Sequence, residues 1–314
     1  MAIETPRINY TGSIRPILLG AGDKSVTVGG ETCYPFYVFE GAMPNLPRIA
    51  MEVYDAPPSD WPEEAMAPYK DVLNDPVAWA KKCINDYGAE MICLQLVSTD
   101  PNDADRSAEE AARTVKNVAE ASGVPLIVWG TGNLEKDTEV LRTVADVCQG
   151  KHVTLGPLVE GNYKKIGAAA MAYKQTSIAS TPLDINLAKQ LNILMGNLGV
   201  NDGEMIMDPL VSSIGYGIEY VYSVMERIRM AALTQQDEKL QLPLICNIAR
   251  ETWKTKEAKI AEVDDPKLGD TAKRGITLEA MSAMLLLLAG ADILIMRHPE
   301  AIKLIREIIS DLTN

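Results

Sequence analysis

The sequence predicts an α/β protein built as a (β/α)8 TIM barrel with an N-terminal β-hairpin extension. Eight short apolar runs recur along the chain and alternate with helical patterns. Most of these runs are continuously apolar, which is typical of parallel strands that are buried on both faces. Eight strand–helix units in about 265 residues match the size of such a barrel. No G-x-G-x-x-G motif follows the first strand, which disfavours a doubly wound dinucleotide-binding sheet.

Two regions are expected along the chain. Residues 1–48 form the hairpin and a covering segment, because Ile14–Gly20 and Ser25–Gly30 flank a glycine-containing turn. Residues 49–314 form the barrel. Its strands are expected at Ile49–Tyr54, Met91–Val97, Val124–Trp129, Val153–Val159, Ser177–Ser180, Met205–Asp208, Leu242–Ile248 and Asp292–Met296.

The helices between these strands carry recognisable start signals. Asp75 precedes Pro76, which suits the first helical position. Ser107 and Glu110 form an S-x-x-E capping box. Apolar stripes at helical spacing are interpreted as the inner faces of the outer helices rather than as cofactor sites.

A long loop is expected at residues 250–275, between the seventh strand and its helix. Loops that follow the strands of a barrel lie on the face where function occurs. Loops longer than about 12–15 residues are usually functional or disordered. A solvated surface excursion is the alternative interpretation.

Composition disfavours several classes of function. The net charge of −13 disfavours duplex nucleic acid and acidic membrane surfaces as partners. The apolar run Ala280–Met296 contains Asp292 and Gly290, so it predicts a buried helix and strand rather than a membrane span. Five dispersed cysteines and two histidines predict no metal or iron–sulfur site on this chain. An odd cysteine count without a signal peptide predicts a reducing, cytoplasmic location.

The carboxyl ends of the strands place polar side chains at one rim. No nucleophile–histidine pair stands among them, so no catalytic residue is predicted. Asn162 and Asp184 also suit helix caps, and the small-residue loop after Asp208 also suits a tight turn. Asn247, Arg297 and His298 belong to the same rim. The residues predicted to bind a cofactor are Thr99, Asp100, Gly130, Asn133, Glu160, Asn162, Asp184, Asp208, Ser212, Gly215, Arg250 and Glu251.

Several long strings resemble one known family. They are Asp208–Tyr220 running into Ser223–Arg229, Thr181–Asn192, and Met296–Ala301. On these strings the chain resembles the small subunit of the corrinoid iron–sulfur protein. The resemblance extends from the hairpin to the last helix.

The resemblance implies a barrel paired with a large subunit, with a cobamide held where the two subunits meet. It implies that the iron–sulfur cluster lies on that partner. The cobalt would accept a methyl group from methyltetrahydrofolate through a separate methyltetrahydrofolate:corrinoid methyltransferase and pass it to acetyl-CoA synthase. The chain would then not be catalytic alone, because the cofactor supplies the nucleophile and the protein supplies position and shielding.

Three alternatives stay open from the sequence. A methyltetrahydrofolate-binding corrinoid methyltransferase barrel would use Asp100, Asn133, Asp184 and Asp208 to cradle a pterin. An unrelated aldolase or isomerase is disfavoured, because no predicted strand core contains a lysine for a Schiff base. A pure assembly scaffold would bind the partner without contacting a cobamide.

Overall fold

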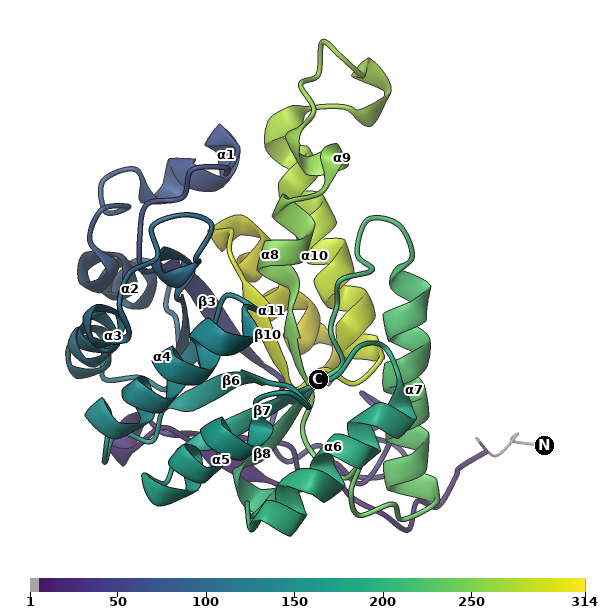
Figure 1. The fold of residues 1–314 in the computed structure, drawn as a ribbon. Helices are drawn as coiled ribbons and strands as arrows, with labels where there is room; N and C mark the ends of the chain where they lie inside the picture. The colour runs from purple at the N-terminus through teal and green to yellow at the C-terminus, as the bar shows by residue number, and fades with distance from the viewer. Residues whose placement is uncertain (1–5, 314) are drawn as a thin grey trace.

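Eight parallel strands form the centre of the computed structural model, which describes residues 6–313 (Figure 1). They follow the order β8-β7-β6-β5-β4-β3-β10-β9, and a bridge between Met207 and Leu244 joins the two edges. This confirms the predicted TIM barrel. The strands are β3 (Arg48–Tyr54), β4 (Met91–Gln95), β5 (Leu126–Trp129), β6 (Thr154–Leu158), β7 (Thr176–Ser180), β8 (Met205–Asp208), β9 (Ile245–Asn247) and β10 (Ile293–Met296).

One long helix follows each strand and covers the outside of the sheet (Figure 1). Their buried faces pack on the outward side chains of the strands in the larger of two hydrophobic clusters. The eight helices are α2 (Pro76–Asn85), α3 (Ala108–Ser122), α4 (Leu134–Val147), α5 (Tyr163–Ala172), α6 (Ile185–Leu198), α7 (Ile218–Thr234), α10 (Thr271–Leu288) and α11 (Pro299–Thr313).

The N-terminal hairpin lies under the amino ends of the barrel strands. It consists of β1 (Ile17–Leu19) and β2 (Val26–Val28), joined through the 3-10 turn η1 (Gly22–Lys24). Its buried side chains share one cluster with the inward-facing residues of the barrel. The hairpin therefore covers the lower end of the barrel and leaves the upper face, at the carboxyl ends of the strands, for function.

The segment predicted as a loop at residues 250–275 contains helical elements. Helix α8 (Ile248–Trp253) begins directly after β9, and α9 (Lys256–Lys259) and η5 (Pro266–Leu268) follow. Helix α10 begins at Thr271, capped by Asp270, and so starts inside the predicted loop. Charged residues interrupt the apolar spacing of this segment, so its sequence does not show the periodicity of a helix. We call residues 248–275 the arm, because in Figure 1 they rise above the upper face.

Shorter elements complete the upper and lower loops. Between β3 and α2 lie α1 (Glu63–Met66) and η2 (Ala67–Tyr69), while η3 (Val97–Thr99) follows β4 and η4 (Asp202–Glu204) precedes β8. None of the helices described for residues 6–313 combines the length and hydrophobicity that crossing a bilayer requires.

Candidate ligand-binding face

Two cavities open on the upper face, one on each side of Arg250. The rim cavity, of about 300 Å³, lies between the β3–α2 connection and the base of the arm. The central cavity, of about 120 Å³, lies above the ends of β5, β6, β8 and β9. Arg250 lines both, so the arm supplies a wall to each of them.

The rim cavity has an aromatic floor around one buried guanidinium. The Arg297 guanidinium carbon lies 3.5 Å from the centre of the Trp61 ring, and its Nε donates to Glu52 at 2.6 Å. Arg297 and Glu52 are 2% and 0% exposed, so the pair is closed to solvent. The other charged residues that line this cavity are Asp60, Asp100, Asp103, Arg250 and Lys254.

The central cavity has polar groups at its base and apolar walls. Asp208 ends β8, and its carboxylate accepts from Ser180 Oγ at 2.7 Å and from the Leu210 amide at 2.9 Å. Asn247 ends β9 and is 6% exposed. The apolar lining comes from Trp129, Pro157, Leu210 and Val211.

Burial controls the acidity of Asp208. The carboxyl group is 2% exposed, and this desolvation raises its pKa to about 6 although two hydrogen bonds favour the charged form. Glu251, which lines the same cavity, raises it further by charge repulsion. Asp208 is thus ionised at neutral pH and takes up a proton in mildly acidic solution.

Replacing Asp208 by asparagine is expected to change how stability depends on pH. The folded-state pKa of Asp208 lies above the value of 3.8 for a free carboxyl. The protonated side chain therefore stabilises the folded state fully below about pH 4, and this stabilisation is lost as the pH rises through 6. The shift corresponds to about 3 kcal/mol. Urea unfolding of both proteins between pH 3.5 and 8 measures this difference. If the stability of the two proteins depended on pH in the same way, the raised pKa of Asp208 would be contradicted.

A buried tryptophan anchors the arm to the barrel. Trp253 is 1% exposed, and its Nε1 donates to Glu279 at 2.8 Å. Its ring stacks on His298 with centroids 5.9 Å apart. A Cβ on Gly275 would lie 2.3 Å from this ring, which explains glycine there. The arm's position over the cavities is therefore set by side-chain packing.

Comparison with known proteins decides the family. The profile described as CO dehydrogenase/acetyl-CoA synthase delta subunit matches residues 16–311. The chain belongs to this family. The delta subunit of the acetyl-CoA decarbonylase/synthase complex of Archaeoglobus fulgidus is 35% identical over 98% of this chain and 70% of its own length. That of Methanocaldococcus jannaschii is 32% identical over 99% of this chain and 76% of its own length. The family predicted from the sequence is confirmed.

Solved structures resemble this chain in fold alone. A dihydropteroate synthase from Xanthomonas albilineans superposes with a TM-score of 0.57 at 14% identity, covering 86% of this chain and 95% of the other. The Coxiella burnetii enzyme gives 0.56 at 14% identity, covering 95% and 98%. Both support the barrel.

The structure brings some of the predicted residues into the cavities. Asp100, Gly130 and Arg250 line the rim cavity, and Asp208, Arg250 and Glu251 line the central cavity. Glu251 also forms an ion pair with Lys254. Their binding roles stay predictions, but their positions agree with a ligand on the upper face.

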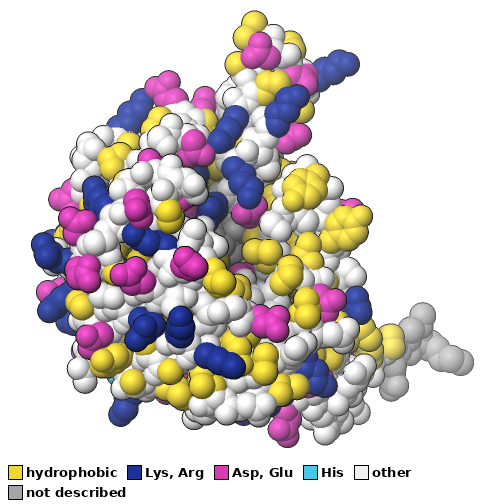
Figure 2. Space-filling view, in the orientation of Figure 1, with side chains coloured by type: hydrophobic (Ala, Val, Ile, Leu, Met, Phe, Trp, Pro, Cys, Tyr) yellow, Lys and Arg dark blue, Asp and Glu magenta, His cyan; other side chains and the backbone are white. Residues whose placement is uncertain are grey.

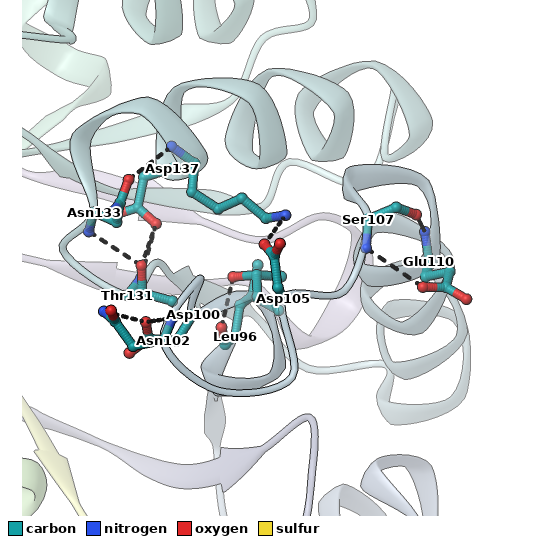
Figure 3. A network of polar contacts seen from close by, with 11 residues as sticks. Leu96, Asp100, Asn102, Asp105, Ser107, Glu110, Thr131, Asn133 and Asp137 are labelled. Carbon is teal, nitrogen blue, oxygen red and sulfur yellow. Dashed lines mark hydrogen bonds and ion pairs between the residues drawn. The ribbon is translucent and has the colours of Figure 1, made fainter.

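Other predicted residues have structural partners instead. Asn133 and Asp184 cap α4 and α6, and the Thr99 hydroxyl donates to Leu96. Asn162 accepts from the Val159 amide at 2.8 Å. Figure 3 shows Thr131, Asn133 and Asp137 converging at the start of α4, beside the loop that holds Asp100 and Asn102. Glu160, Ser212 and Gly215 line neither cavity; Glu160 and Gly215 are exposed and Ser212 is half-buried.

Sequence reasoning missed the aromatic and carboxylate residues that shape the upper face. Asp137 accepts from the amides of Thr131 and Gly132 at 2.9 and 2.8 Å, and a Cβ on Gly130 would lie 2.6 Å from its carboxylate. Trp61 and Trp129 line the two cavities. Trp129 ends its predicted strand, which was the available signal, whereas nothing local marked Asp137 or Trp61. Within residues 6–313, no cluster of three or more His, Cys, Asp or Glu side chains is arranged to hold a metal ion.

Proposed function

We propose that this chain is one subunit of a corrinoid methyl carrier and helps hold a cobamide on its upper face, against a large partner subunit. The observation that carries this proposal is the family match over residues 16–311. The relatives are named as delta subunits of the acetyl-CoA decarbonylase/synthase complex, so membership in a multi-subunit assembly supports the proposal.

The residues of the upper face fit a corrinoid. A corrin ring is a broad apolar plate with carboxamide side chains at its edge, so it suits apolar walls interrupted by polar groups. The central cavity offers Asp208 and Asn247 at its base, with Trp129 and Leu210 beside them. Asn247 Oδ1 is buried without a hydrogen-bond partner, which favours a ligand that supplies one.

The side chains present suggest separate roles for the cobamide and for this chain. When bound, the cobamide would supply the cobalt that carries a methyl group from methyltetrahydrofolate, by way of a methyltransferase, to acetyl-CoA synthase. This chain would orient the cofactor through Asp208, Asn247 and Arg250, and its arm would exclude water from one side. The iron–sulfur cluster is proposed to lie on the large subunit, and the complex to be cytoplasmic.

The partner surface is proposed beside the central cavity. Leu210 and Tyr216 in the β8–α7 connection are 36% and 79% exposed, and Tyr220 in the first turn of α7 is 62% exposed. Figure 2 shows hydrophobic side chains gathered over the start of α7 and basic side chains in the hollow beside the arm. Exposed aromatic residues of this kind are typical of protein–protein interfaces.

Co-expression with the large subunit of the same source in a corrinoid-supplied host tests this function. We expect a one-to-one complex whose absorption spectrum shows a corrinoid, and loss of that corrinoid when this chain is omitted. Tyr216→Asp with Tyr220→Asp should weaken the complex, whereas Leu18→Asp on the hairpin should not. A chain that ignores the large subunit and binds methyltetrahydrofolate by itself would instead be a methyltransferase.

A further inference from the structure

Asn247 differs from Asn133 and Asp184, which also precede helices on the upper face, and from Asn162, whose side-chain oxygen accepts from the Val159 amide. It occupies the residue before α8, where an asparagine side chain ordinarily accepts a hydrogen bond from the first turn. Asn133 and Asp184 do so for their helices, but Asn247 makes no capping bond. Its side chain lines the central cavity instead, and its buried Oδ1 has no partner.

Asp208 supplies a complementary group in the same cavity. Its two oxygens each accept one hydrogen bond, from Leu210 N and from Ser180 Oγ. A carboxylate has about four acceptor sites, so capacity remains for a donor that enters the cavity. The carboxylate is an acceptor only, whereas the Asn247 amide offers both a donor and an acceptor.

The size and the charge of the central cavity limit the chemical groups that it can bind. A cavity of about 120 Å³ holds several waters or one small polar group, but not a macrocycle. The apolar walls of Trp129, Pro157 and Val211 favour a group with a short hydrocarbon stem. Arg250 and Glu251 line the cavity as well. Glu251 is paired with Lys254, and the charge of Arg250 offsets that of Asp208, so the lining has no net charge that would favour an ammonium group. A neutral group that both donates and accepts satisfies all of these surroundings.

We infer that the central cavity is a subsite for a primary carboxamide, which donates its NH2 group to Asp208 and exchanges hydrogen bonds with Asn247. Two sources share this chemistry, namely a carboxamide arm of a corrin ring and a free small amide. The corrin source rests on the proposed function, while the subsite itself rests on the cavity.

Titration of the full chain, in complex with its large subunit, with dicyanocobinamide tests the corrin source by absorption. Asn247→Leu keeps the side-chain volume and removes its polar atoms, and Asp208→Asn removes the carboxylate. Each is expected to raise Kd about tenfold, the loss of one buried hydrogen bond. The heptamethyl ester of cobyrinic acid has no N–H donors, so the same variants should change its Kd less than about twofold.

Control variants distinguish a loss of ligand binding at the subsite from a loss caused by misfolding. Asn201→Leu replaces an exposed asparagine at the lower end of the barrel, where it caps η4, and should leave both affinities unchanged. Asn247→Ala provides a smaller replacement if leucine disturbs the fold, which circular dichroism checks. Equal binding of dicyanocobinamide by wild type and both variants would overturn the subsite and leave the proposed function standing.

Binding of propionamide distinguishes failure of the proposed corrinoid function from failure of the carboxamide subsite. We expect it to shift the side-chain NH2 resonances of Asn247 in a ¹H–¹⁵N spectrum of the full chain, and Asp208→Asn to abolish the shift. If the wild-type complex does not bind dicyanocobinamide, the proposed function fails, and this shift would still support the subsite for a free amide. Absence of the shift, or a larger one with propylammonium, would overturn the inference.

Discussion

Replacing Arg297 by methionine is expected to lower the free energy of unfolding by about 3–5 kcal/mol, because it leaves the Glu52 carboxylate buried without its partner. Glu52 is 0% exposed, and it also accepts a hydrogen bond from Gln95 Nε2 at 3.1 Å. The guanidinium also donates to Tyr54 Oη at 3.2 Å and stacks on Trp61. Denaturant unfolding at pH 7 measures the effect.

The position of this pair explains why the loss is large. Glu52 belongs to β3 and Arg297 follows β10, the first and last strands of the barrel, which pair side by side. Arg48→Met is the matched control, since Arg48 and Glu90 are 31% and 59% exposed and such pairs contribute less than about 1 kcal/mol. Adding Glu52→Gln to Arg297→Met should recover part of the loss. Equal destabilisation by Arg48→Met and Arg297→Met would refute the buried-charge explanation.

Replacing Trp253 by alanine is expected to lower the free energy of unfolding by about 3–5 kcal/mol and to loosen the arm. The substitution removes the ring that fills the space beside Gly275 and the donor to Glu279. Burial raises the pKa of Glu279 to about 7 even though it accepts hydrogen bonds from Trp253, Arg297 and His298. Amide hydrogen exchange should therefore accelerate across residues 248–262.

Conservative variants divide this effect into its parts. Trp253→Phe keeps an aromatic ring beside His298 but removes the hydrogen bond to Glu279 and part of the ring volume, so it should cost about 2–3 kcal/mol, less than alanine. Val263→Ala, at a residue that is 85% exposed on the arm, should change stability by less than about 0.5 kcal/mol. Wild-type exchange rates in the arm of Trp253→Ala would show that another contact positions it.

Much of the fold could be read along the chain because its signals are local. Continuous apolar runs predicted the parallel strands, and the strings at Asp75 and Ser107 predicted helix starts that the structure contains. The arm was misread as a loop. Its helices are short and charged, and Trp253, 22 residues before Gly275, packs against it across a turn that no local pattern reveals.

The candidate site was predicted less completely than the fold. Asp208 and Arg250 could be placed on the upper face because Asp208 ends a strand and Arg250 follows one. The same reasoning also selected Asn133 and Asp184, which cap helices. An asparagine that caps a helix and one that lines a cavity look alike in sequence, because the difference lies in where the side chain finds its hydrogen-bond partner.

By itself, the sequence determined the barrel, the hairpin below it and the family, since periodicity and long shared strings are properties of the chain alone. The tertiary structure decided which rim residues meet. Asp208 and Asn247 lie on strands whose ends come together only when Met207 and Leu244 close the barrel. It also decided that Asn247 keeps an unpartnered oxygen, because burial and hydrogen-bond satisfaction depend on neighbours that are distant in sequence.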